Sequence, residues 1–256
     1  MTATNAQYPD EIRFLGFDLE TVRLAPRRRF DDPSALNVGI SCASVALSAT
    51  EVKVWEGRPA LTVDQCQSMV HELEQLSFPN TPNRLVTWNG ASFDFRVLAE
   101  ESQLRQRCVR LMVNHVDLMF LLLAQKGWLV GFENALQAMG LSGKKKCVTL
   151  NDGSILNEMG GHMAPELWEK GEYTAVVEYN KEDSIQTQKL AQAAHAQQGL
   201  AWSAKSTGKK QYLSTPLLSI KECLALPQPD LSWMQGSRLP PTRKQLLSWA
   251  LRQPAT

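Results

Sequence analysis

Short apolar segments with strand character alternate with longer segments of helical spacing over most of this 256-residue chain. The predicted strands cover residues 12–19, 38–47, 51–55, 84–88 and 111–116. The second and third strands, joined by a Ser-Ala-Thr turn, form a predicted β-hairpin. The predicted helices cover residues 62–76, 93–106, 118–125, 132–139, a short stretch from 165, and 172–198. This alternation is typical of an α/β fold in which helices cover a sheet.

The composition changes near residue 200. Residues 201–256 carry eight Lys or Arg and two acidic residues, a net charge of +6, whereas residues 1–200 carry a net charge of −5. The second segment is also rich in proline and shows little periodicity beyond a short predicted helix at 242–252. We therefore expect a main domain over 1–200 and a basic C-terminal extension over 201–256. Trp202, Trp233 and Trp249 indicate that the extension packs on that domain, because large aromatic side chains gain from burial.

Cysteine usage and hydropathy exclude several classes of protein. The five cysteines are widely spaced and include no C-x-x-C pair, which argues against a disulfide framework and a zinc site. The first residues lack the basic and apolar regions of a signal peptide, and no apolar run is long enough to span a bilayer. The net charge of +1 gives no global signature of nucleic-acid binding. We expect a cytoplasmic protein with no membrane association.

Two carboxylates stand two positions apart at the end of the first predicted strand, in the sequence Phe-Asp-Leu-Glu. Side chains two apart on a strand point to the same face, so Asp18 and Glu20 are expected to converge. Paired carboxylate oxygens suit a hard divalent cation such as Mg²⁺. A D-x-E pair is also frequent by chance, and a solvated strand end is the plain alternative.

Two more acidic residues occupy positions from which they could join this pair. Asp94 lies in the first turn of a predicted helix that follows an apolar strand and an Asn-Gly turn, where the helix dipole alone also favours an acid. Asp183 lies on the long predicted helix with Tyr179 four residues before it, hence on the same face. The phenol could orient an attacking water beside a metal ion. The order of strand end, strand-to-helix turn and late helix gives the joint pattern its specificity.

Over residues 11–198 the sequence resembles the DEDD superfamily of 3′–5′ exonucleases. Three motifs carry the resemblance: F-D-L-E-T, N-G-A-S-F-D and Y-N-K-E-D. It implies a ribonuclease-H-like fold, in which helices flank a five-stranded mixed sheet whose second strand runs antiparallel to the others. Within the superfamily, the sequence is most similar to predicted bacterial exonucleases related to the proofreading domain of family-B polymerases.

The resemblance also implies two divalent cations, Mg²⁺ or Mn²⁺. Asp18, Glu20 and Asp183 would hold the ion that activates water, and Asp18 with Asp94, through water, would hold the other. One branch of the superfamily has His at the position that is Glu here, five residues before the last Asp. Tyr179 stands four before it and therefore indicates the tyrosine (DEDDy) branch. Asp117, after the fifth predicted strand, could tune the site indirectly or simply cap a helix.

Substrate contacts are expected beside the first two motifs. The resemblance implies that the nucleic acid is contacted by Leu19, Thr21, Asn89 and Phe93. Aromatic faces stack on bases without sequence preference, although a core position is the stronger alternative for Phe93 and for Trp88. Lys144 begins one of three basic clusters, at 144–146, 27–29 and 209–210, that could neutralise phosphates. Such charge runs are also common on solvated loops.

The expected function is release of nucleoside 5′-monophosphates from single-stranded DNA or RNA with a free 3′ end. Two alternatives stay open. One is a structure-specific endonuclease of the same fold, and the other is a non-catalytic nucleic-acid-binding module. The presence of all four acids and the tyrosine disfavours the second. The sequence identifies no repair or replication partner.

Overall fold

The computed structural model describes residues 12–26, 32, 34–77, 82–144, 146–204, 207–232, 234 and 239–251. Its centre is a five-stranded sheet with the order β3-β2-β1-β4-β5. The strands are β1 (Arg13–Thr21), β2 (Ile40–Ala46), β3 (Val52–Glu56), β4 (Asn83–Thr87) and β5 (Val116–Asp117). β2 runs antiparallel to β1 and to β3, whereas β1, β4 and β5 are parallel. This arrangement confirms the predicted α/β fold with its antiparallel second strand.

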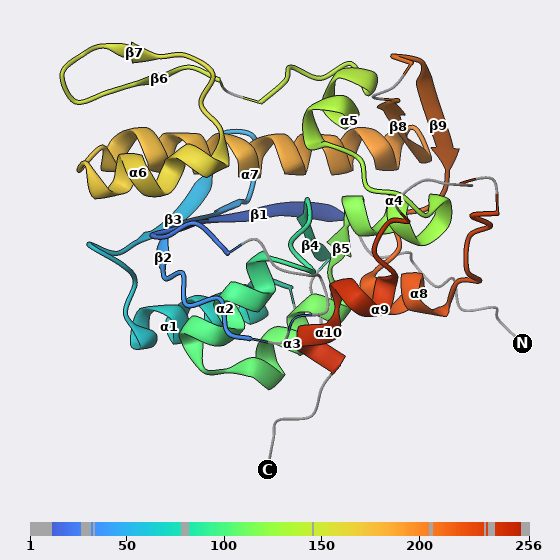
Figure 1. The fold of residues 1–256 in the computed structure, drawn as a ribbon, viewed down its shortest axis with the longest axis horizontal. Helices are drawn as coiled ribbons and strands as arrows, with labels where there is room; N and C mark the ends of the chain where they lie inside the picture. Colours follow the sequence, from blue (N-terminus) through green and yellow to red (C-terminus); the bar gives the residue numbers. More distant parts are fainter. Residues whose placement is uncertain are drawn as a thin grey trace, which may run out of the picture.

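Helices cover both faces of the sheet (Figure 1). Above it in this view lie α7 (Tyr173–Ala196), α6 (Ala164–Glu169) and α5 (Phe132–Ala138). Below it lie α1 (Val63–Ser77), α2 (Asp94–Ser102) and α3 (Arg105–Asn114), and α4 (Leu118–Lys126) lies beyond β5. Because both faces are covered, β1 and β2 are buried along almost their whole length.

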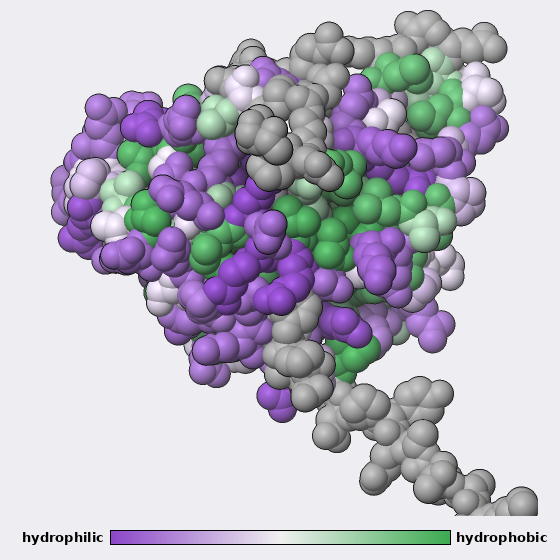
Figure 2. All heavy atoms as spheres, turned by 90° about the horizontal axis from the view of Figure 1, so that it is seen from below, coloured by the Kyte–Doolittle hydropathy of each residue, from purple (hydrophilic) through white to green (hydrophobic). Residues whose placement is uncertain are grey.

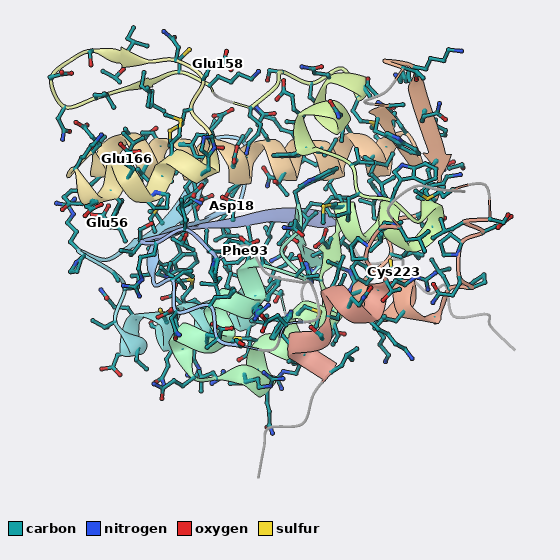
Figure 3. All side chains as sticks on the ribbon, viewed as in Figure 1. Asp18, Glu56, Phe93, Glu158, Glu166 and Cys223 are labelled. Carbon is teal, nitrogen blue, oxygen red and sulfur yellow. The ribbon has the colours of Figure 1, made fainter. Side chains whose placement is uncertain are left out.

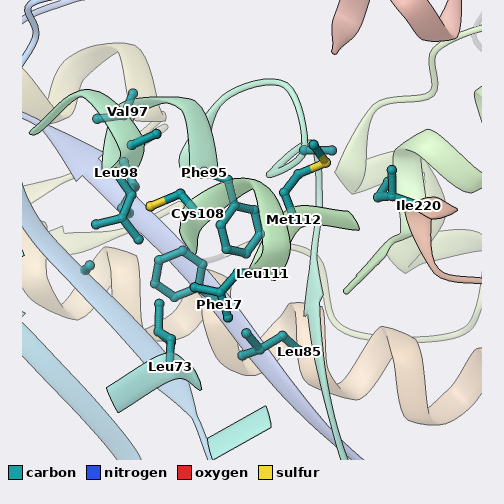
Figure 4. Close-up of a cluster of buried hydrophobic side chains, with 14 of the residues drawn as sticks. Phe17, Leu73, Leu85, Phe95, Val97, Leu98, Cys108, Leu111, Met112 and Ile220 are labelled. Atoms are coloured by element: carbon teal, nitrogen blue, oxygen red, sulfur yellow. The ribbon is translucent and has the colours of Figure 1, made fainter. Parts of the chain in front are cut away.

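The largest core cluster lies between the sheet and the lower helices. Figure 4 shows Phe17 of β1 close to Phe95 and Leu111, and the rings of Phe17 and Phe95 lie 5.7 Å apart. The outer sides of these helices are polar. Figure 2 views this face from below and shows a mostly hydrophilic surface with a band of hydrophobic residues across its middle. The helices are therefore amphipathic, as the spacing in residues 62–76 predicts.

The segment after residue 198 is built into the same body. β8 (Gly199–Ser203) and β9 (Lys210–Ser214) form a hairpin, with β8 running across residue 200. α8 (Ile220–Ala225), α9 (Arg243–Leu246) and α10 (Ser248–Leu251) lie beside α3 and α4. Trp202 and Trp249 are buried, whereas Trp233 lies outside the described residues. The predicted helix at 242–252 is thus two short helices interrupted at Leu247.

The prediction of a strand at residues 111–116 is wrong. Residues 105–114 form α3, and only the two-residue β5 follows. α2 ends at Ser102, and its C-cap Gln103 adopts the left-handed conformation with φ 59°, which separates α2 from α3. Cys108, Leu111 and Met112 are the buried positions of α3, a spacing that fits one helix face. Two small ladders were also not predicted: β6 (Val148–Thr149) with β7 (Ile155–Leu156), and the β8–β9 hairpin.

Arg243 fastens the C-terminal helices to the body. Its side chain is 3% exposed and donates hydrogen bonds to four backbone carbonyls, among them Cys223 O at 3.0 Å and Ala124 O at 2.7 Å. Replacing Arg243 by Met leaves these buried acceptors without donors, so we expect a loss of at least about 2 kcal/mol in unfolding free energy. Urea denaturation measures it, with the exposed neighbour Lys244→Met as control. Equal stability of the two variants would contradict this stabilising role of Arg243.

No helix among the described residues is both long and apolar enough to cross a membrane.

Candidate metal centre

The end of β1 places the first two acidic residues. Asp18 pairs with Ser44 and Glu20 with Cys42 on the neighbouring strand, so both side chains leave the same face. The register shifts between Glu20 and Thr21, at the point where the strand ends. Glu20 is buried and Asp18 half-buried, in the middle of the molecule. Figure 3 shows Asp18 there, whereas acidic residues such as Glu166 lie at its edge.

Close packing of α7 on β1 brings the third acid to this strand. A Cβ atom at Gly16 would collide with the backbone of Ser184 and Gln188, so glycine is required for the helix to approach this closely. Asp183 therefore lies directly over the strand end. Carboxylate oxygens of Asp18, Glu20 and Asp183 all lie within 4.8 Å of one another.

Asp94 enters from the turn between β4 and α2. Its Oδ1 accepts a hydrogen bond of 3.0 Å from the backbone N–H of Leu19, which fixes it against β1 between the first two acids. Its oxygens fall outside the close group of three, but it lines the same cavity of about 410 Å³. We refer to Asp18, Glu20, Asp94 and Asp183, the candidate metal ligands, as the metal centre.

Lys144 and Tyr179 lie beside Asp183. The Lys144 ammonium lies 2.5 Å from Asp183 Oδ2 and donates to the Tyr179 hydroxyl at 2.9 Å. Although burial disfavours the charged form of Lys144, these two acceptors raise its pKa. Burial and the nearby Asp183 carboxylate raise the pKa of Tyr179, so the phenol stays protonated at neutral pH.

The metal centre concentrates negative charge in a poorly solvated place. Burial and mutual repulsion raise the pKa of Asp18 and of Glu20 well above their ordinary values. Burial also raises the pKa of Asp183, against the effect of Lys144, and raises that of Asp94 to about 7, against its hydrogen bond from Leu19. Such a cluster is costly without cations, and a divalent ion removes the repulsion.

The donor set fits a divalent cation. All donors are carboxylate oxygens, which Mg²⁺ and Mn²⁺ prefer. The buried Asp183 Oδ1 has no hydrogen-bond partner among the described residues, so it is free to act as a ligand. Asp18 is held in place by Asn180, whose amide donates to Asp18 Oδ2 at 2.8 Å.

The residues predicted to contact substrate all line the cavity. They are Leu19, Thr21, Asn89, Phe93 and Lys144. Trp88 also lines it and stacks on Phe132 with ring centres 5.2 Å apart, so this ring combines a wall position with a packing contact. Lys145, in the same cluster as Lys144, and the cluster at residues 27–29 lie outside the described residues. Lys209 and Lys210, the third cluster, are not among the cavity residues.

Sequence reasoning missed several residues of this site. His162 lines the cavity next to Gly161, in the short 3₁₀ helix η1 (Gly161–Met163). Asn180 was also missed, although it stands inside the third motif. Asp117 caps α4 through Phe120 N–H, and it also accepts a hydrogen bond of 3.0 Å from Asn89 N–H in the turn that lines the cavity.

Comparison with known proteins places the fold. No curated protein matches the sequence. Among solved structures, the chain is similar to the family B DNA polymerase from the hyperthermophilic archaeon Pyrobaculum calidifontis, with 19% sequence identity and a TM-score of 0.49 over 73% of this chain. The match covers 25% of the polymerase, so this chain spans about a quarter of its length. A family model described as the RNase_H superfamily matches residues 17–195, most of the chain and the whole metal centre. The chain therefore belongs to the RNase_H superfamily.

Proposed function

We propose that this protein is a metal-dependent 3′–5′ exonuclease of the tyrosine branch, which releases nucleoside 5′-monophosphates from single-stranded DNA or RNA. The observation that carries the proposal is the group of carboxylate oxygens from Asp18, Glu20 and Asp183 within 4.8 Å of one another, with Asp94 in the same cavity. Membership of a superfamily with a ribonuclease-H-like fold supports a nuclease. The 3′–5′ polarity rests on the resemblance of the three motifs to those of the DEDD superfamily.

The carboxylates divide into two ligand sets. Asp18, Glu20 and Asp183 would hold one Mg²⁺ or Mn²⁺, and Asp18 with Asp94 would hold the second. Two such ions activate a water and stabilise the leaving oxygen of an in-line displacement at phosphorus. Asp18 is the shared ligand, and the hydrogen bond from Asn180 fixes its orientation. The N–H of Leu19 orients Asp94 in the same way.

The protonated hydroxyl of Tyr179 can orient a water molecule by donating a hydrogen bond. Its raised pKa keeps the hydroxyl protonated, so it can donate a hydrogen bond but is a poor base. Its ring is 1% exposed, packed so that the hydroxyl points at Lys144 and the carboxylates. We therefore assign Tyr179 to orienting the attacking water.

The size of the cavity suits the 3′ end of a single nucleic-acid strand. A volume of about 410 Å³ lies in the range of pockets that enclose small ligands, roughly 300–1,000 Å³. Leu19 and Thr21 border it on β1, and Asn89 and Phe93 border it from the turn after β4. These residues would hold the terminal nucleotide, with Phe93 offering a face for its base.

Lys144 would contact a substrate phosphate once metal ions occupy the carboxylates. Replacing Lys144 by Met should lower kcat/KM for single-stranded DNA about tenfold at low salt and make the slope of log(kcat/KM) against log[salt] shallower by about 0.7, the value for one phosphate contact. Lys146→Met is the matched control, because Lys146 is half-exposed and is not among the cavity residues. An unchanged slope in Lys144→Met would contradict the phosphate contact.

The proposed activity is tested with Mn²⁺ and single-stranded DNA and RNA of equal sequence, each labelled at its 5′ end. An exonuclease of this polarity produces a ladder that shortens from the 3′ end and leaves circular and 3′-blocked strands intact. Cleavage of the circular strand would instead indicate an endonuclease. Binding without any product would indicate a non-catalytic module.

A further inference from the structure

The turn between β4 and α2 determines the geometry of one side of the metal centre. Residues 88–93 carry Asn89 and Phe93 into the cavity and lead directly to Asp94. Asn89 adopts the left-handed conformation with φ 74°, which asparagine adopts more readily than most residues other than glycine. Hydrogen bonds with residues outside the turn hold its backbone in place.

Side chains from outside the turn form hydrogen bonds with its backbone N–H groups and with one of its carbonyls. The N–H groups of Asn89 and Ala91 donate to Asp117 at 3.0 and 2.9 Å, and Gly90 N–H donates to Thr87 Oγ1 at 3.2 Å. The carbonyl of Ala91 accepts a bond of 2.9 Å from the indole Nε1 of Trp249, 158 positions along the chain. The C-terminal segment thus supplies one bond of the turn.

Trp249 is itself buried and hydrogen-bonded to the body of the protein. It is 4% exposed and belongs to the same core cluster as Ala91. Arg105 of α3 donates to its carbonyl oxygen. The rest of the segment is fastened through Ile220 N–H to His115 O at 3.0 Å and through Arg243 to Ala124 O. Figure 1 shows α8, α9 and α10 together, next to α3.

We infer that Trp249 is a positioning residue of the nuclease: through Ala91 it holds the turn that presents Asn89, Phe93 and Asp94. The inference rests on the proposed function and gives the C-terminal segment a part in catalysis. Trp249 touches no substrate and acts only through the turn. Losing its bond should displace Asp94 slightly, whereas Asp18, Glu20 and Asp183 keep their places on β1 and α7.

The test is Trp249→Phe, which keeps a buried ring but loses the N–H donor. Trp202→Phe is the control, because Trp202 is 3% exposed and belongs to a different core cluster. In Trp249→Phe we expect kcat to fall about ten- to a hundredfold, the scale of a small misplacement of catalytic groups, with KM changing less. Hydrogen exchange at the amides of residues 89–91 should become faster. Trp202→Phe should change neither quantity.

Wild-type exchange at residues 89–91 in Trp249→Phe would overturn the inference, as would unchanged kcat or an equal loss of kcat in Trp202→Phe. If Trp249→Phe does not fold, 3-benzothienylalanine at position 249 tests the same bond, since sulfur replaces the N–H in an isosteric ring. If the wild-type protein degrades no nucleic acid, the proposed function fails. Unaltered exchange in the variants would separately show that Trp249 does not hold the turn.

Discussion

Replacing Asp18 by Asn should lower nucleotide release by about a thousandfold or more. Asp18 is the ligand that both proposed metal ions share, and an uncharged amide oxygen is a weak ligand for a hard divalent cation. Losing about 4 kcal/mol of metal-derived stabilisation of the transition state corresponds to about a thousandfold in rate. The measurement is the initial rate on labelled single-stranded DNA in saturating Mn²⁺. Asp64→Asn, at an exposed position in the first turn of α1, is the control and should keep wild-type activity.

The same substitution should stabilise the metal-free protein. Burial, together with Asp94, Asp183 and Glu20, raises the pKa of Asp18, which means that its charged form is disfavoured in the folded state. A neutral amide avoids this cost at pH 8. Each kcal/mol gained raises Tm by about 2–4 °C in a protein of this size. Residual activity near the wild-type rate would refute the site, and a large fall in Tm without metal would show that Asp18 has a structural role instead.

Removing divalent cations with EDTA should reduce nucleotide release to the background rate. Restoring Mn²⁺ or Mg²⁺ to about 100 times its Kd should raise the unfolding free energy by about 2.7 kcal/mol, because the ions bind the folded protein alone. Thermal unfolding over a range of metal concentrations measures this effect. The stabilisation should be largely lost in Asp18→Asn. Full activity in EDTA would exclude the proposed chemistry.

The stability of the metal-free protein should fall as the pH rises. Burial and mutual repulsion raise the pKa of the metal centre's carboxyl groups, to about 7 for Asp94, whereas in the unfolded chain they ionise near pH 4. Between these values the folded protein binds more protons, so it is progressively destabilised as they leave. Unfolding in EDTA should therefore occur at a higher temperature at pH 5.5 than at pH 8. Metal should stabilise the protein more at pH 8, where protons compete less.

Local patterns predicted four of the five strands of the sheet and singled out the acids that the structure brings to one strand end. The strand that carries Asp18 and Glu20 is mostly apolar before them, and the helix that carries Tyr179 and Asp183 is long, so both elements follow from their own residues. The structure brings Asp18, Glu20 and Asp183 together at the strand end. Asp18 and Glu20 share one face of a strand, and Tyr179 and Asp183 share one face of a helix. Both pairs can be identified from their spacing in the sequence.

Contacts between distant segments could not be predicted in this way. Residues 111–113 are apolar and Val116 is β-branched, which suits a strand, but residues 111–114 belong to α3 because its buried face packs into the lower core. The β8–β9 hairpin begins at residue 199, where the composition changes. It was not predicted because that change was interpreted as a domain boundary. Asn180, Asp117 and Trp249 have roles that depend on partners far along the chain, which no local pattern reveals.

The close approach of α7 to β1 determines when, during synthesis of the chain, the acids can come together. Asp18 and Asn180, which meet there, are 162 positions apart. A chain emerging from the ribosome presents its N-terminal part first, so the strand end exists long before the helix that completes it. Until residue 183 has been made, Asp18 and Glu20 lack their third partner. An incomplete chain is therefore unable to assemble the group of three carboxylates.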